Sequence, residues 1–114
     1  MDSHLELRDP YIAVLHLKEN ITVYQLQKMK GLLGEVKARI GDRKKLVLDL
    51  SALSFMDPLA LGVMVAFSKE FREKGGDIKI VNMNGDLKKI FDESRLSRVY
   101  EAYDSVSEAA RSFH

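Results

Sequence analysis

The most constraining feature of this sequence is the short, almost unbroken apolar run Leu46-Val47-Leu48-Asp49-Leu50. A run of this length and composition is typical of a strand buried on both faces, at the centre of a sheet covered by helices. A few residues later, Asp57-Pro58 places a favoured helix N-cap before a favoured first helical residue. The helix is expected to run to about Lys74, where Gly75-Gly76 ends it. The chain therefore contains a buried strand that leads through a short loop into a helix.

The rest of the chain alternates strand and helix patterns around this unit. Before it, we expect two strands and an amphipathic helix whose apolar residues recur at three- and four-residue steps. After it, we expect a strand, a short helix, a short strand and a last helix that opens with capping-box spacing. In chain order, these elements cover residues 5–7, 11–17 and 22–39, then 78–81, 85–93, 99–100 and the stretch from Ser105. The order ββαβαβαβα predicts an α/β fold in which helices pack on one sheet.

Length and composition limit the classes of function. The 114 residues, 46% of them hydrophobic, suffice for one compact domain over residues 1–114. The net charge of +1 gives no general attraction to nucleic acid or to an acidic membrane. The sequence has no cysteine, no apolar stretch as long as a membrane span and no signal peptide pattern. We expect a cytoplasmic protein, with no nucleic-acid or membrane partner, that recognises its partner through a local surface.

Catalytic and metal sites find no support in the residue pattern. The three histidines, His4, His16 and His114, lack the spacing of metal ligands, so we expect neither a metal nor a cofactor. No nucleophile, base and orienting residue form a recognisable set, so we expect no enzymatic activity. The charged runs at residues 43–45 and 72–74 are interpreted as solvated surface.

Candidate binding residues gather around the loop and helix after the buried strand. Asp57 is expected to cap the helix, and contact with a partner is compatible with that role. Asp49 lies between two leucines, so its charge requires a hydrogen-bonding partner, and we favour a structural role for it. The first half of the helix is apolar almost all round. Its main stripe is Ala60, Met64, Phe67 and Phe71, and outside it lie Leu59, Leu61 and Val65. Either neighbouring helices cover these extra residues, or they form an exposed patch that binds a partner.

Residues 46–62, LVLDLSALSFMDPLALG, resemble the central strand, loop and helix start of STAS domains. The usual form there is apolar-apolar-Asp-Leu-Ser, a short apolar loop, and Asp-Ser-Ser/Thr-Gly-Leu-Gly. The stretch from Ile80 to Phe113, which contains VNMNGDLKKIFDESRLSRVYEAYDSVSEAARSF, also resembles the family. The resemblance implies a single STAS-like domain, with a mixed sheet of about five strands and about four helices packed largely on one side.

Two places depart from the family pattern. Residues 18–21, Lys-Glu-Asn-Ile, stand where the family often has Gly-x-Leu-Asp after its second strand. Pro58, Leu59 and Ala60 stand where the family has Ser, Ser or Thr, and Gly. The position of the usual phosphate acceptor is therefore Leu59, which has no hydroxyl. Ser51 and Ser54 are the nearby alternative acceptors, although hydrogen bonding within a loop is the ordinary role of such serines.

The resemblance implies an anti-sigma factor antagonist, a bacterial regulator that binds an anti-sigma factor of the protein kinase type and so releases a sigma factor. Phosphorylation at the helix start switches such binding off, because it puts negative charge into an apolar contact. The implied partner-binding residues are Ser54, Asp57, Pro58, Leu59, Ala60, Leu61 and Val63. We expect a monomer or a weak homodimer. The alternative function is a small-ligand or nucleotide-binding sensor built on the same fold.

Overall fold

The central apolar run forms β3 (Lys45–Asp49), the middle strand of a five-stranded sheet in the order β1-β2-β3-β4-β5. The computed structural model describes residues 1–113, so His114 lies outside the described residues. Strand β1 (Ser3–Leu7) pairs antiparallel with β2 (Ile12–Leu17), and β2, β3, β4 (Asp77–Val81) and β5 (Glu101–Tyr103) are parallel. The side chains of β3 from Leu46 to Leu48 are at most 1% exposed. The predicted mixed sheet with a buried central strand is confirmed.

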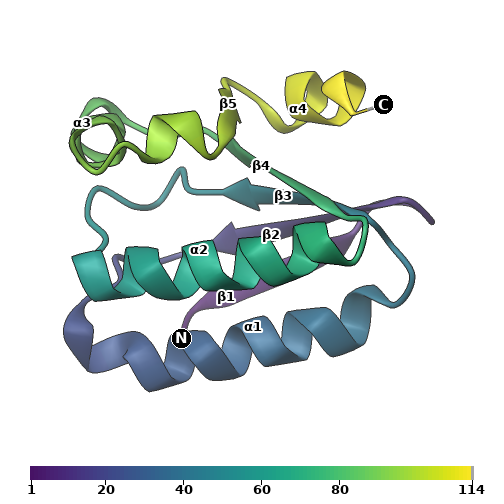
Figure 1. Cartoon of the computed structure of the whole chain (residues 1–114), viewed down its shortest axis with the longest axis horizontal. Coiled ribbons are helices and arrows are strands. Elements are labelled where there is room, and N and C mark those ends of the chain that lie inside the picture. Colours follow the sequence, from purple (N-terminus) through teal and green to yellow (C-terminus); the bar gives the residue numbers. More distant parts are fainter. Residues whose placement is uncertain (114) are drawn as a thin grey trace.

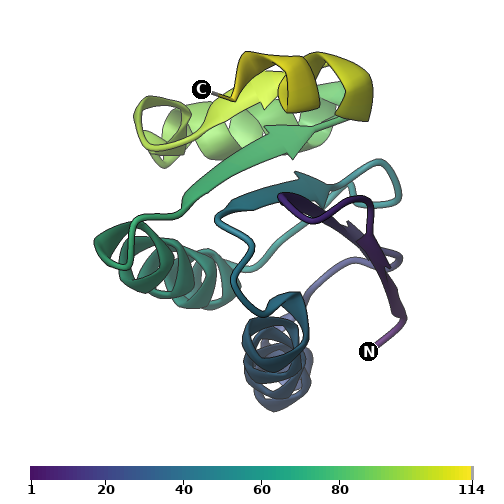
Figure 2. The same ribbon diagram turned by 90° about the vertical axis from the view of Figure 1, so that its right-hand side faces the viewer.

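The helices lie mainly on one face of the sheet, as predicted. Figures 1 and 2 show α1 (Leu26–Ile40) and α2 (Pro58–Glu73) side by side on one face, and α4 (Val106–Ser112) on the other. The main core lies between the sheet and the larger layer, and it includes buried residues of α1, α2 and α3 (Gly85–Glu93). A smaller cluster under α4 contains Val14, Val47 and Val81. The alternation along each strand separates the two clusters, because neighbouring side chains point to opposite faces.

Local signals set both ends of α2. The Asp57 carboxylate accepts a hydrogen bond from the Leu59 N–H at 2.8 Å, which satisfies one of the free donors of the first turn. At the other end, Gly75 has a φ of 89°, a left-handed conformation that glycine adopts without strain. A Cβ atom at Gly76 would collide with the ring of Phe71. The turn between α2 and β4 therefore requires the two glycines for different reasons.

Several predicted boundaries shift by one or two residues, and two of the differences have a clear local cause. The short strand expected at residues 99–100 is β5 at Glu101–Tyr103, because the N–H groups of Val99 and Tyr100 both donate to the Leu96 carbonyl in a 3₁₀ turn. The first helix opens with another 3₁₀ turn, Val23–Gln25, before α1 begins. Thr22 is the N-cap residue of that turn, and its N–H donates to the Gln25 side chain at 2.9 Å. The order of the elements is as expected, but β5 begins just after residues 99–100 and includes neither of them.

Candidate functional site

Two loops lie side by side beyond the carboxyl ends of β2 and β3. A β-bridge pairs Ile21 with Met56, and the Asp57 N–H donates to the Ile21 carbonyl at 2.8 Å. Asn20 makes a further contact between the two loops. Its side-chain oxygen accepts hydrogen bonds from the N–H groups of Ser54 at 2.8 Å and Phe55 at 3.2 Å. These contacts hold the start of α2 beside the 3₁₀ turn that precedes α1. The region that departs from the family pattern, residues 18–21, thus supports the loop expected to bind a partner.

Large apolar side chains are exposed on these two loops. Tyr24 is 93% exposed and Leu59 is 59% exposed, while Val23 and Phe55 are each 42% exposed. We call Val23, Tyr24, Phe55 and Leu59 the apolar end patch. Single exposed apolar residues are ordinary, but a group of four on two adjoining segments is typical of a protein-binding surface. Val23, Tyr24 and Phe55 are not among the expected contact residues, because only the fold places their segments beside the helix start.

The structure divides the expected contact residues into accessible and buried ones. Ser54, Pro58 and Leu59 are exposed, and Asp57 and Val63 are half-buried. Ala60 and Leu61 are 0% and 4% exposed, so their side chains are packed in the core and are not available at the surface. Neighbouring elements therefore cover Leu61, one of the extra apolar residues of α2, whereas Leu59 stays exposed. Val65, the third, is partly buried against the core.

Asp49 has the structural role that its position predicts. Its Oδ2 lies 2.6 Å from Nδ1 of His16, and its Oδ1 accepts from the Asn82 amide and the Ser51 N–H, each at 3.1 Å. Burial alone would raise the pKa of this carboxyl, but the hydrogen bonds from His16, Asn82 and Ser51 together lower the pKa below its ordinary value. The network lies on the face of the sheet opposite α2. It links the end of β3 to His16 of β2 and to Asn82, and it holds Ser51 at the start of the loop.

The network continues from Asp49 to the edge of the sheet. Nε2 of His16 lies 3.2 Å from Oε1 of Glu6, so the imidazole ring bridges carboxylates of β1 and β3. The ring of His4 stacks on that of His16, with centroids 5.8 Å apart. No group of three or more acidic or histidine side chains in residues 1–113 has the geometry of a metal site. Sequence spacing did not reveal this cluster because its members come from different strands.

The two alternative phosphate acceptors occupy different surroundings. Both Ser51 and Ser54 are exposed. The backbone N–H of Ser51 is bound by the Asp49 carboxylate at 3.1 Å, so a phosphate on Ser51 would lie close to a negative charge. The hydroxyl of Ser54 accepts a hydrogen bond from the Asn20 amide at 3.3 Å and lies in the loop that carries the apolar end patch. Electrostatics therefore favours Ser54 over Ser51.

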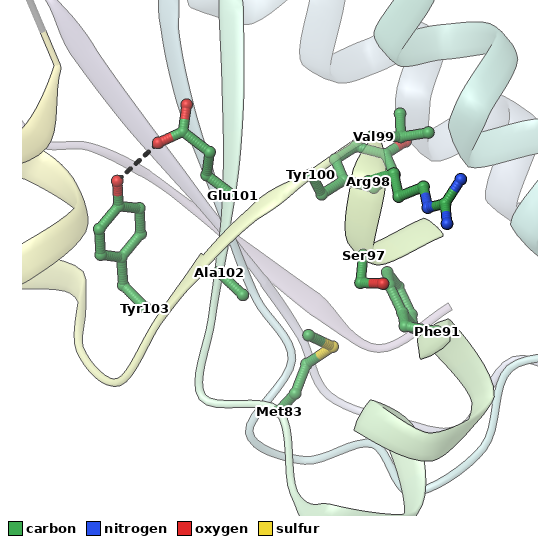
Figure 3. Close-up of a pocket in the computed structure, with 9 residues that line it drawn as sticks. All are labelled: Met83, Phe91, Ser97, Arg98, Val99, Tyr100, Glu101, Ala102 and Tyr103. Carbon is green, nitrogen blue, oxygen red and sulfur yellow. Dashed lines mark hydrogen bonds between the residues drawn. The ribbon is translucent and has the colours of Figure 1, made fainter. Parts of the chain in front are cut away.

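A separate hollow lies along β5, at the edge of the sheet (Figure 3). Its volume is about 520 Å³, and its lining includes Met83, Phe91, Arg98 and the β5 residues. Tyr103 donates a hydrogen bond to Glu101 at 2.8 Å beside it. None of the expected contact residues lines this hollow.

No helix within residues 1–113 combines the length and apolar character needed to cross a membrane.

Comparison with known proteins identifies the family to which the sequence belongs. The chain matches the STAS domain family over residues 7–109. It is 32% identical over 65 residues to a Thermotoga maritima protein that is a candidate anti-sigma factor antagonist, covering 57% of this chain and 58% of the relative. It is 33% identical over 60 residues to the anti-sigma F factor antagonist of Paenibacillus polymyxa, covering 53% of this chain and 51% of the relative. These matches span little more than half the length of either curated relative.

The fold also matches a solved structure. The crystal structure of an anti-sigma factor antagonist from Mycobacterium paratuberculosis aligns with a TM-score of 0.82, covering 96% of this chain and 91% of that chain. The two sequences are 19% identical, so this likeness concerns the fold alone.

Proposed function

Because this chain belongs to the STAS domain family, we propose that it is an anti-sigma factor antagonist, which binds an anti-sigma factor and thereby releases a sigma factor. The proposed partner is an anti-sigma factor of the protein kinase type, and the proposed place of action is the bacterial cytoplasm. The protein itself acts by binding and performs no catalysis. The observation that carries the proposal is the apolar end patch, which covers the helix start where we expect the partner contact and the adjoining 3₁₀ turn.

The chemistry of the patch suits a protein partner. Leu59, Tyr24 and Phe55 present apolar surface without a charged side chain among them. Docking against a second apolar surface would remove this area from water, a gain of about 25 cal/mol for each Å² buried. The ordered loops reduce the entropy lost on binding, because Asn20 and the Ile21–Met56 bridge already hold their conformation. Such a preformed apolar surface suits a protein that competes with a sigma factor for the anti-sigma factor.

Regulation should differ from that of family members with a serine at the helix start. Residues 58–60 are Pro, Leu and Ala, so a kinase finds no hydroxyl there. Any phosphate that blocks binding would have to be placed elsewhere, and Ser54 is the favoured acceptor because Ser51 lies against Asp49. A phosphate on Ser54 would put about two negative charges beside the apolar end patch and would weaken an apolar contact. Without such a modification, the protein is constitutively competent to bind.

The experiment that tests the proposal is Leu59→Glu, measured by isothermal titration calorimetry against the anti-sigma factor of the same organism. Leu59 is 59% exposed in the first turn of α2, where the helix dipole favours a carboxylate, so the variant should fold normally. A charge in the contact should weaken binding by about tenfold or more, since an unpaired charge would be desolvated there. Circular dichroism and urea unfolding establish that the variant is folded.

Leu7→Glu is the matched control. Leu7 is 42% exposed at the end of β1, away from the apolar end patch, because it pairs with Ala13 at the start of β2. Its substitution should change the affinity for the anti-sigma factor less than about twofold. Equal affinities for wild type and folded Leu59→Glu would exclude this helix start as the contact. Absence of any interaction between the wild-type protein and the anti-sigma factor would exclude the proposed function itself.

The alternative function, small-ligand or nucleotide sensing, has weaker support. The hollow beside β5 is large enough for a small molecule, but among residues 1–113 Arg98 is the one cation in its lining. A nucleotide site ordinarily cradles the phosphates with several backbone N–H groups of a glycine-rich loop, and no glycine lines this hollow. We therefore favour a protein partner over a nucleotide.

A further inference from the structure

The seam between α1 and α2 is hollowed along the outer face of the molecule. Two adjoining hollows, of about 310 and 160 Å³, share Lys37 of α1 and Glu70 of α2 in their linings. The first extends to Lys30 and Val63, and the second to Arg43 and Lys74. Figure 1 shows the two helices side by side over most of their length. The Lys37–Glu70 ion pair crosses the seam where the two hollows meet. We call the two hollows together the α1–α2 groove.

The floor of the groove is apolar, and the Lys37 ammonium lies over the ring of Phe67. Leu33, Phe67 and Phe71 form its base and belong to the main core. Gly34 and Ala66 lie at its surface, both exposed, and a Cβ atom at Gly34 would meet nothing within 4 Å. Small residues at this position let the backbone of another element approach closely. These small residues leave room for an apolar helix face at the surface of the groove.

The rim of the groove is positively charged. Its lining contains one acidic residue, Glu70, and five basic ones, namely Lys30, Lys37, Arg43, Lys44 and Lys74. Glu70 pairs with Lys37 at 2.5 Å and with Lys74 at 3.3 Å, and these two lysines lower the pKa of its carboxyl. The side-chain ammonium groups of Lys30 and Lys44 have no hydrogen-bond or ion-pair partner among residues 1–113. The groove therefore retains several uncompensated positive charges.

The positive charge is concentrated in the groove and is not a property of the whole molecule. The whole chain has a net charge of only +1, so the remainder of the molecule is net negative once the groove is set apart. The charged runs at residues 43–45 and 72–74 are separated in sequence and look like ordinary solvated surface. The fold brings Arg43, Lys44 and Lys74 together at one end of the groove. A local positive potential over an apolar floor selects a partner of opposite charge and matching shape.

We propose that the α1–α2 groove is a docking site for an amphipathic helix with acidic flanks, supplied by a partner protein. The apolar stripe of that helix lies over Gly34 and Ala66, and its acidic side chains face the lysines on both rims. A concave seam between two helices fits a helix better than it fits the flat surface of a membrane. This inference goes beyond the proposed function, because the groove is distinct from the apolar end patch and does not need an anti-sigma factor to be tested.

The test uses the full chain and a fluorescein-labelled synthetic peptide of about 18 residues, long enough to form a helix on binding. Leucines at helical i, i+3, i+4 and i+7 spacing form its apolar stripe, and glutamates fill the other positions. We expect saturable binding by fluorescence anisotropy that weakens as salt is added. A matched peptide with lysine in place of every glutamate should not bind. In ¹⁵N-labelled protein, amide shifts on binding should map to α1 and α2.

Charge reversal on α1 supplies a matched pair of variants. Lys30→Glu changes a rim lysine, whereas Lys28→Glu changes an exposed lysine of the same helix that does not line the groove. We expect Lys30→Glu to weaken peptide binding about fivefold or more, and Lys28→Glu to change it less than twofold. Ala66→Phe, which fills the groove without changing charge, should weaken it about tenfold or more. Leu59→Glu should leave peptide binding within about twofold of wild type, which separates this site from the apolar end patch.

Four results would overturn the proposal. The first is no saturable binding of the acidic peptide at concentrations up to about 1 mM. The second is equal binding of the lysine peptide, and the third is equal weakening by Lys30→Glu and Lys28→Glu. The fourth is binding to phosphatidylglycerol vesicles that Lys30→Glu abolishes, without binding of the acidic peptide, which would assign the groove to a membrane surface instead. Each variant is checked by circular dichroism, so a loss of binding cannot come from unfolding.

Discussion

Replacing Asp49 by Ala removes the centre of the hydrogen-bond network at the end of β3. The carboxylate is bound by the His16 ring at 2.6 Å and by the Asn82 amide and the Ser51 N–H at 3.1 Å each. The residue is only 8% exposed, so water cannot replace these partners fully in the variant. A hydrogen bond in such a site contributes about 1 kcal/mol, and a donor left without its partner costs more. We expect Asp49→Ala to lower the free energy of unfolding by about 3 kcal/mol.

Urea unfolding at pH 7, followed by circular dichroism, measures this effect. The midpoint should fall with an unchanged slope, and the melting temperature should drop by about 10–15 °C for a domain of this size. Asp49→Asn keeps the size of the side chain and one carbonyl acceptor but loses the charge, so it should cost about 1–2 kcal/mol. Asp42→Ala is the matched control, because Asp42 is exposed and should change stability by less than about 0.5 kcal/mol.

The pH dependence gives an independent check with a definite sign. The pKa of Asp49 is lowered in the folded protein from 3.8, since the hydrogen bonds favour the charged form more than burial opposes it. The stabilisation is therefore fully present above pH 3.8 and is lost as the pH falls below 3.8, through the folded-state pKa. The difference in unfolding free energy between wild type and Asp49→Ala should shrink on acidification. A difference that grows at acid pH, or an Asp49→Ala variant as stable as Asp42→Ala, would refute this account.

Three further predictions concern the N-cap of α2, the turn that follows α2, and phosphorylation of the loop that precedes it. Asp57→Ala removes the acceptor for the first-turn N–H and should cost about 1 kcal/mol in urea unfolding, whereas Asp57→Asn should cost less. Gly76→Ala drives a methyl group into the ring of Phe71 and should cost about 1–3 kcal/mol, so a neutral result would mean that the ring moves aside freely. After incubation with the cognate kinase, mass spectrometry should find residues 57–62 unmodified and place any phosphate on Ser54; a phosphate on Ser51 would contradict the electrostatic argument.

The order of elements follows from interactions that span only a few residues. Asp57 caps α2 through the N–H of Leu59, and Ser105 caps α4 through the N–H of Glu108 at 3.1 Å. Such contacts are written into adjacent sequence, so they can be predicted without knowing the fold. The same holds for the buried run that forms β3, because an apolar segment of that length without polar alternation needs cover on both faces. The family resemblance rested on these local features.

The candidate surfaces, by contrast, were decided by tertiary structure. Periodicity along α2 identifies residues outside its main stripe, yet it cannot say that neighbouring elements bury Leu61 while Leu59 stays exposed. Nor can it place Tyr24 beside the start of α2, since the Ile21–Met56 bridge that does so joins distant segments. The contact of His16 with Asp49 depends on the parallel register of β2 and β3.

The α1–α2 groove, like the other surfaces, depends on tertiary structure and cannot be read from local sequence. Its lysines and glutamate are visible in the sequence only as unremarkable charged surface residues. Their combined potential exists because α1 packs beside α2 and because Arg43 and Lys74 line the same hollow. Short-range signals determine which elements form, because capping, turn and burial preferences act within a few residues. Which side chains share a surface depends on how those elements pack, and that is a property of the whole chain.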